Sequence, residues 1–454
     1  MTRHGATRSS RRMDLTSRLR AIVRPAGAAP RELTYEPDTG RYEAVMDMDR
    51  VADALGGRLV SNTFGRALVI DRRYESDRYH GTLRVGDCEV SDSDGLRLLD
   101  PGLPARDGNS ERCRRTLFVD LETTGLSGGA GTVAFLVGCG WFDMGAFQVR
   151  QFLLTSYAAE RALLTAVAEC FDDCALLVTY NGKTFDVPVM ETRWMFHRLR
   201  MPLESVRHFD MLHPARRLWR TRRAGADDGE GGCGLGTLER VLCDVRRVGD
   251  VPGMEIPARY FQFLRTGDAN PLEPVLEHNR LDLISLAAVT AHAVRLVEQG
   301  SDACRDAAES LGLGKVLERA GGMERAIPCY QRAADDPSAP IDIVAESLYR
   351  LGLRLRRARR FVEAADVWRR IIDLRQPRYG RRSVVLTPIR QFAVEALAIH
   401  HEHRERDYAG AKELALLLLD EDEAGARHRL ARLDRKLAGK DPQKKNSHLF
   451  GGCS

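Results

Sequence analysis

The hydrophobic pattern of this chain changes at about Gly300, and that change constrains the fold more than any other feature of the sequence. Before it, short apolar runs of strand length alternate with segments of helical spacing. Three successive strands, then helix, strand and helix, predict a mixed central sheet flanked by helices, an α/β fold. After it, only helical patterns follow. The expected strands are LFVDLE (117–122), VAFLVGCGWF (133–142), FQVRQFLL (147–154) and ALLVTYN (175–181), and the expected helices are 160–171, 188–199 and 273–298.

Three helix-turn-helix patterns in the second part of the chain align with one another. Ala326, Ala364 and Ala411 take the same place in each, and Tyr330 and Trp368 follow the first two by four residues. Small residues where helices cross, with an aromatic residue one turn later, resemble tetratricopeptide repeats. The spacings of 38 and 47 residues exceed the usual repeat of about 34. An ordinary helical bundle is the alternative interpretation.

Four acidic residues are associated with the ends of predicted elements. Asp120 and Glu122 alternate along one strand, so both side chains leave the same face of the sheet. Asp186 follows another strand, and Asp282 lies on the long helix with His278 one turn earlier on the same face. Such a cluster is too repulsive to bury without cations, and oxygen ligands suit hard divalent metals such as Mg²⁺ or Mn²⁺. Two such ions a few ångströms apart are a known arrangement for in-line attack on a phosphodiester.

Taken singly, these residues have simpler interpretations. Asp120 and Glu122 could form a charge pair on an edge strand, and Asp186 could be a turn former. His278 could be a surface residue of its helix. The apolar run up to Asp120, together with the order and spacing of the set, favours one shared site.

Three motifs, FVDLETTGL, YNGKTFD and HNRLD, resemble the exonuclease motifs of the DEDD superfamily, which has a ribonuclease-H-like fold. Within it, the chain is similar to the YprB-type ribonuclease-H-like family, whose bacterial members often carry tetratricopeptide repeats behind the nuclease domain. The segments FGRALVIDRRY and FDMLHPARRLW also resemble that family. The resemblance covers about Phe64 to Ala291, and the repeats extend it.

The resemblance implies a site and an activity. By motif match, Asp120, Glu122, Asp186 and Asp282 are catalytic residues that hold two divalent metal ions, Mg²⁺ or Mn²⁺, and His278 is the general base. The implied enzyme is a 3′-to-5′ exonuclease that hydrolyses single-stranded DNA or RNA. The superfamily places Tyr four residues or His five residues before the last Asp, whereas this chain has His at the four-residue position. The alternative is a nucleic-acid-binding scaffold with a non-catalytic ribonuclease-H-like fold and protein-docking repeats.

Nucleic-acid contacts are expected around the same motifs. Thr123 follows the first acidic pair, and Asn181 and Lys183 lie in the loop before the third carboxylate, near the scissile phosphate. Arg216 and Arg217 begin a group of five arginines within eight positions. Exposed arginines are commonly only solvated, but a cluster beside a nuclease site favours contact with the phosphate backbone.

Basic residues also gather away from these motifs. Residues 345–382 contain twelve Arg and four acidic residues, and Met1–Arg24 contains seven Arg and one Asp. The N-terminal stretch has little apolar periodicity, so a disordered basic arm is expected there. The expected parts are a basic arm (1–45), a small β-rich lead-in (46–105), the ribonuclease-H-like domain (112–300), tetratricopeptide-like repeats (305–438) and a flexible tail (439–454).

Several classes of protein are disfavoured by the sequence. No apolar run approaches the length of a membrane span. Ten cysteines without a C-x-x-C pair predict reduced thiols, and the basic N-terminus has no apolar segment of the kind found in secretory signals. We therefore expect a cytoplasmic protein without a membrane partner, which binds nucleic acid and contacts a protein partner through its helical repeats.

Overall fold

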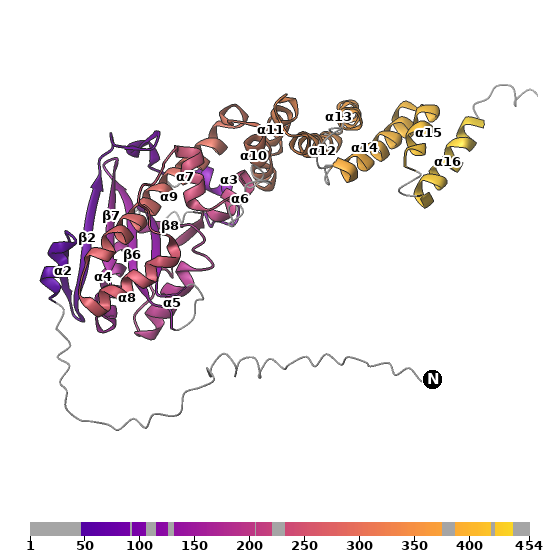
Figure 1. The fold of residues 1–454 in the computed structure, drawn as a ribbon. Helices are drawn as coiled ribbons and strands as arrows, with labels where there is room; N and C mark the ends of the chain where they lie inside the picture. Colours follow the sequence, from indigo (N-terminus) through magenta and orange to yellow (C-terminus); the bar gives the residue numbers. More distant parts are fainter. Residues whose placement is uncertain are drawn as a thin grey trace, which may run out of the picture. The chain divides into compact units, whose positions relative to one another are not determined.

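The computed structural model describes residues 47–90, 93–105, 115–125, 131–204, 206–219, 232–374, 386–418 and 423–438 (Figure 1). All described residues belong to one unit of the chain, Asp47–Ser454. The predicted basic arm and tail lie outside the described residues, as do Arg220, Arg222 and Arg223. Among the described residues we find no helix with the length and apolarity needed to cross a membrane.

A seven-stranded mixed sheet forms the first part of the described chain, as predicted. Its order is β1-β2-β7-β6-β5-β8-β9, antiparallel from β1 to β5 and parallel from β5 to β9. The strands of the predicted lead-in extend this sheet, because β2 pairs with β7. The bounds are β1 (Arg58–Asn62), β2 (Gly65–Tyr74), β5 (Arg115–Thr123), β6 (Ala134–Asp143), β7 (Ala146–Leu153), β8 (Cys174–Thr179) and β9 (Arg207–Asp210), with a separate pair β3 (Tyr79–His80) and β4 (Leu83–Arg84).

The long helix α9 (Glu273–Gln299) packs across β5, β6 and β7 (Figure 1). A glycine makes this close approach possible: a Cβ atom at Gly138 on β6 would lie 2.2 Å from Oδ1 of Asn279. The other helices of this part are α2 (Met48–Ala54), α3 (Asp94–Leu99), α4 (Glu160–Ala168), α5 (Asp186–Phe196), α6 (Leu212–Trp219), α7 (Leu235–Cys243) and α8 (Ile256–Thr266).

After α9 the described chain is helical, which confirms the predicted fold class. Two helical hairpins repeat one packing contact at a spacing of 38 residues: Gly314 faces the ring of Tyr330, and Gly352 faces the ring of Trp368. A Cβ at either glycine would lie within 2.5 Å of the ring, so the small residue lets the aromatic side chain fill the space between the helices. The helices are α10 (Ala307–Arg319), α11 (Met323–Asp335), α12 (Ile341–Arg357), α13 (Phe361–Asp373), α14 (Leu386–His400), α15 (Tyr408–Leu416) and α16 (Glu423–Ala438).

The helical region is joined to the sheet region through α10 and α6. A Cβ at Gly312 would lie 2.2 Å from the carbonyl oxygen of Leu218, so the two helices meet backbone to backbone. The indole Nε1 of Trp219 donates a hydrogen bond of 2.9 Å to Glu309, which is fully buried. Buried apolar residues on both sides of this junction form one continuous core.

Candidate active site

Asp120 and Glu122 lie on β5, the strand at which the sheet changes from antiparallel to parallel pairing. Leu117, Phe118 and Val119 before them are buried. The two acidic side chains alternate with Leu121 and so share one face of the strand, as predicted. Both are only partly exposed to solvent. An interior strand of the sheet therefore carries two carboxylates on one face.

Asp186 is the first residue of α5, and its side chain is buried. The preceding strand β8 runs parallel to β5, so the carboxyl ends of both strands lie at the same edge of the sheet. The backbone N–H of Leu121 donates a hydrogen bond to the Asp186 carboxylate. The third predicted carboxylate is thus held directly against the strand that carries the first two.

The loop before Asp186 is shaped by Asp210, at the end of β9. The carboxylate of Asp210 is buried and accepts hydrogen bonds from the backbone N–H groups of Asn181 (2.8 Å), Lys183 (3.0 Å) and Leu212 (3.1 Å). Asn181 takes the left-handed conformation, with φ of 69°. Asp210 therefore fixes the turn that delivers Asp186 to the site.

Helix α9 carries Asp282, the fourth predicted carboxylate. It also carries Asn279, which contacts Asp120. Asp282 and His278 lie one turn apart, with 3.6 Å between His278 Nε2 and Asp282 Oδ2. The buried Asn279 donates from Nδ2 to Asp120 Oδ2 at 2.8 Å, and accepts a bond of 2.8 Å from Gln151 Nε2. Asn279 therefore ties α9 to β5 and β7 and holds the Asp120 carboxylate in place.

Repulsion from neighbouring carboxylates adds to burial in raising the pKa of Asp120 and Glu122. Burial, with repulsion from Asp282, Glu122 and Asp186, raises the pKa of Asp120 well above its usual range. Burial, with repulsion from Asp282, Asp186 and Asp250, raises the pKa of Glu122 to about 8. Burial raises the pKa of Asp186 to about 7. The repulsion is of the kind that positive charge relieves.

A buried arginine borders the cluster on one side. The guanidinium of Arg247, 9% exposed, forms an ion pair with Asp282 and a bidentate pair with Glu239 at 2.7 and 2.8 Å. It also lies 3.3 Å from the carboxylate of Asp250. In turn, Asp250 Oδ1 lies 2.6 Å from His278 Nδ1. Asp282 and His278 are therefore both contacted by charged residues of the loop between α7 and α8, Asp282 by Arg247 and His278 by Asp250.

The sequence did not point to four of these residues. Arg247 and Asp250 lie in a Gly- and Pro-containing loop, where charged residues are usually solvated. Asn279 and Asp210 stand inside segments that carry the family resemblance, but neither is a ligand type that the carboxylate pattern singles out. The signal available in the sequence for Asn279 and Asp210 was their position inside the motifs HNRLD and FDMLHPARRLW.

The residues predicted to contact nucleic acid differ in their surroundings. The buried hydroxyl of Thr123 donates to the carbonyl of Gly125. Asn181 is exposed, and Lys183 pairs with Asp100 at 3.2 Å. Arg216 is exposed on α6, whereas Arg217 is half-buried. Of the five, the exposed Asn181, Lys183 and Arg216 lie most openly toward solvent.

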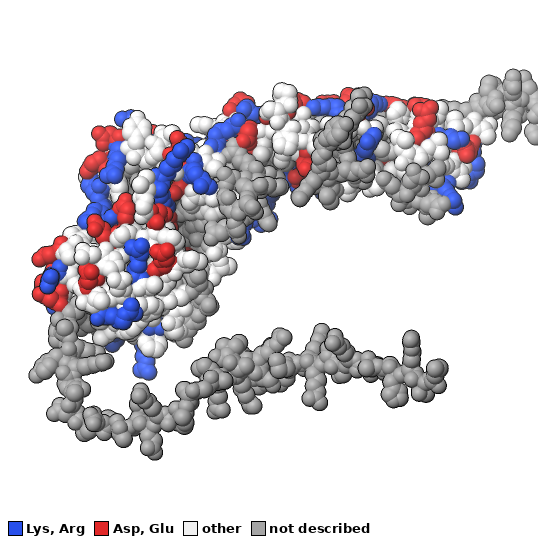
Figure 2. All heavy atoms as spheres, viewed as in Figure 1, with Lys and Arg blue, Asp and Glu red and all other residues white. Residues whose placement is uncertain are grey.

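Several arginines of the helical region form ion pairs with acidic side chains. Figure 2 shows basic and acidic side chains interspersed on the face of the helices in view. Arg350 pairs with Glu318 and Glu346, and Arg354 also pairs with Glu318. These pairs reduce the net positive field of the predicted basic segment, of which residues 375–385 lie outside the described ranges.

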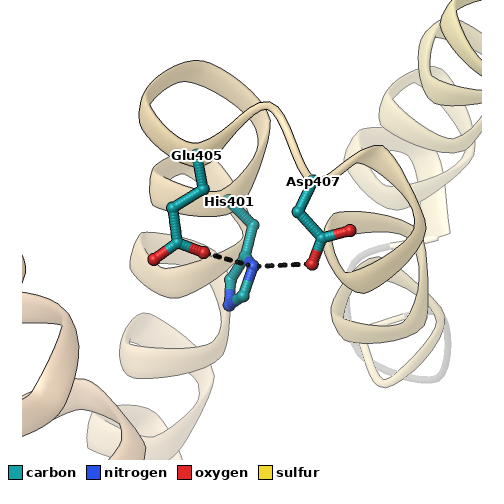
Figure 3. A group of neighbouring side chains, drawn as sticks. All are labelled: His401, Glu405 and Asp407. Carbon is teal, nitrogen blue, oxygen red and sulfur yellow. Dashed lines mark hydrogen bonds and ion pairs between the residues drawn. The ribbon is translucent and has the colours of Figure 1, made fainter.

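A separate group of titratable side chains lies between α14 and α15 (Figure 3). Among the described residues, His401, Glu405 and Asp407 are the group of three His, Cys, Asp or Glu whose ligand atoms all lie within 4.8 Å of one another. His401 Nδ1 lies 3.0 Å from Glu405 and 3.1 Å from Asp407. Asp407 also caps α15 through the N–H of Gly410, and Glu405 pairs with His400. These contacts within one short segment explain why the three side chains lie together at the end of α14 and the start of α15.

Two comparisons with known proteins bear on the family of this chain. Residues 117–294, which include all four carboxylates, match the family model of the RNase H superfamily. The protein YprB of Bacillus subtilis (strain 168) is 32% identical over 332 residues, which cover 70% of this chain and 74% of YprB. The superfamily match supports a nuclease-like or nucleic-acid-related function. The chain therefore belongs to the YprB-type family of ribonuclease-H-like proteins.

Proposed function

We propose that this protein is a metal-dependent nuclease, a 3′-to-5′ exonuclease that hydrolyses single-stranded DNA or RNA. The observation that carries the proposal is the gathering of carboxylates around β5, where burial and repulsion from neighbouring carboxylates raise the pKa of Asp120 and Glu122, and burial raises that of Asp186. Repulsion between carboxylates destabilises the folded protein, and bound cations would relieve it. Perturbed pKa values of this kind are typical of functional sites. The 3′-to-5′ direction and the single-stranded substrate rest on the resemblance to DEDD exonucleases.

The donor set fits divalent cations. Asp120, Glu122, Asp186 and Asp282 offer only carboxylate oxygens, the ligands that Mg²⁺ and Mn²⁺ prefer. The guanidinium of Arg247 pairs with Asp282, one of these four residues. These four residues would hold the ions. When bound, two divalent ions supply Lewis acidity and positive charge at the reacting phosphate.

The chain's own residues have separate tasks in this proposal. His278 accepts the proton of the attacking water at Nε2, the ring nitrogen that faces Asp282. Asn279 keeps the Asp120 carboxylate oriented through its 2.8 Å hydrogen bond. Lys183, in the loop that Asp210 holds, lies exposed beside the site and contacts the phosphate backbone. His278→Ala should lower kcat roughly a hundredfold, the usual contribution of a positioned base.

The helical region is proposed to pack as tetratricopeptide-like repeats and to bind a protein partner. The Gly314–Tyr330 and Gly352–Trp368 contacts at a 38-residue spacing support the repeat assignment.

The test uses the full chain with single-stranded DNA and RNA labelled at either end. Incubation with Mn²⁺ or Mg²⁺ should shorten the strands stepwise from the 3′ end, and EDTA should stop the reaction. A circular single strand should stay intact, because it has no 3′ end. Binding of the strands without cleavage in either metal would contradict the proposal and favour a non-catalytic scaffold.

A further inference from the structure

The ring of His278 is held from outside its own helix. Its Nδ1 lies 2.6 Å from Oδ1 of Asp250, in the loop between α7 and α8. A carboxylate can only accept a hydrogen bond, so Nδ1 carries the proton. In the neutral ring, Nε2 is then the acceptor, and it is Nε2 that lies toward Asp282, at 3.6 Å. The contact therefore sets both the tautomer of the ring and the direction of its lone pair.

The carboxylate of Asp250 is itself fixed in place. Its Oδ1 accepts the backbone N–H of Val251 at 2.9 Å, and its Oδ2 lies 3.3 Å from Arg247. Arg247 is bound to Glu239 on α7 and to Asp282 on α9. Glu239 is buried and also accepts a hydrogen bond from Ser285 of α9. Asp250, the partner of His278, is thus linked through Arg247 to residues of α7 and α9, two helices that pack together.

We propose that Asp250 is a positioning residue that acts through His278, and that Arg247 couples this pair to Asp282. An imidazole on a helix surface can take several staggered orientations, and its two nitrogens can exchange the proton. The Asp250 carboxylate selects the orientation and tautomer in which Nε2 is free to accept a proton beside Asp282. The effect of Asp250 on catalysis rests on the proposed function. The hydrogen bond between Asp250 and His278 can be tested in protein that is not turning over substrate.

The kinetic test uses the full chain, saturating Mn²⁺ and an end-labelled single strand. Asp250→Ala should lower kcat about 10- to 100-fold, the usual effect of losing a supporting partner, with little change in KM. Asp250→Asn should retain more activity, because its amide oxygen still accepts from Nδ1. In a His278→Ala background, Asp250→Ala should have no further effect, because Asp250 then has nothing to position. Glu255→Ala, which removes an exposed carboxylate beside α8, is the matched control and should leave kcat unchanged.

A second readout separates this inference from the proposed function. In metal-free protein labelled with ¹⁵N-histidine, the ring signals of His278, assigned from their loss in His278→Ala, should report a proton on Nδ1. They should shift toward a tautomer mixture in Asp250→Ala and not in Glu255→Ala. If wild type does not cleave but this shift occurs, the proposed function is wrong and the positioning contact stands. Unchanged ring signals, or losses in kcat that multiply in the double variant, would overturn the inference.

Discussion

Buried carboxylates occur in both parts of this protein, but their surroundings are opposite. Around β5, Asp120 and Asp186 face other carboxylates, and their pKa values are raised. At the junction with the helical region, Glu309 on α10 is fully buried, yet its pKa is lowered despite burial. Arg305 pairs with it at 3.0 Å, and Trp219 donates to it at 2.9 Å. Among the described residues, Asp120 and Asp186 accept hydrogen bonds but form no ion pair with an arginine, whereas Glu309 has both kinds of partner.

This difference separates a binding site from a structural ion pair. A carboxylate that is buried with donors and a cation contributes to the fold, and removing it leaves the partners unsatisfied. A carboxylate that is buried among others of its kind destabilises the fold until a ligand brings positive charge. Replacing a carboxylate of the acidic cluster by its amide should therefore stabilise the metal-free protein and abolish cleavage. Replacing Glu309 by its amide should destabilise the protein and leave cleavage unchanged.

The largest expected effect is on cleavage by Asp120→Asn. The amide keeps the size of the side chain and an oxygen that accepts from Asn279, but it removes a metal ligand. Cleavage should fall below about one thousandth of wild type, a loss of about 4 kcal/mol in transition-state stabilisation. The metal-free variant should be more stable than wild type by about 1 kcal/mol, because repulsion is relieved. Gel assays of strand shortening and thermal unfolding in EDTA measure the two effects.

Asp71→Asn is the control for that substitution, because Asp71 lies on β2, apart from the proposed site, and pairs with Arg58 of β1 and Arg150 of β7. It should cleave as wild type does. Wild-type cleavage by Asp120→Asn would show that the acidic cluster is not the metal site.

The next effect is on folding stability. Glu309→Gln should destabilise the protein by about 3 kcal/mol, because Arg305 and the other donors to Glu309 lose their charged acceptor. Denaturant unfolding, followed by tryptophan fluorescence, measures the loss. Cleavage by the folded fraction should be unchanged, because Glu309 lies at the junction with α6 and not at the acidic cluster. A variant as stable as wild type would mean that the junction does not depend on this ion pair.

The smallest effect is a dependence of stability on pH. In the folded metal-free protein Asp186 and Glu122 have pKa values of about 7 and 8, far above the value of about 4 for unfolded chains. The folded state therefore binds more protons, and stability falls as pH rises through this range. The buried His80 and His208, with pKa values lowered to about 4, act in the opposite direction, but only below about pH 6.5.

The window from pH 6.5 to 8 thus isolates the acidic cluster. In EDTA, the free energy of unfolding should fall there by about 1 kcal/mol per pH unit. Mn²⁺ should abolish the slope, and Asp120→Asn should reduce it. An equal slope with and without Mn²⁺ would place the titrating groups elsewhere.

The sequence by itself determined the class of fold, and it indicated four carboxylates as the candidate metal ligands. Strand and helix patterns are local, so the sheet strands β5 to β8, the long α9 and the helical hairpins could all be predicted from periodicity. Asp120 and Glu122 could be assigned to one face because two residues make one period of a strand. The alignment of Tyr330 with Trp368 likewise reflects a packing contact that recurs in two hairpins, although the small residue that faces each ring is a glycine, Gly314 or Gly352.

Only the tertiary structure decided which side chains support that site. Asn279 holds Asp120 from 159 residues away, and Asp250 reaches His278 across 28 residues and two helices. The pairing of β2 with β7, which brings the lead-in strands into the sheet, also joins segments far apart in sequence. Such contacts depend on how elements pack, and no local period records them. A single charged residue in a loop looks the same in sequence whether it faces solvent or the imidazole of a histidine on another element.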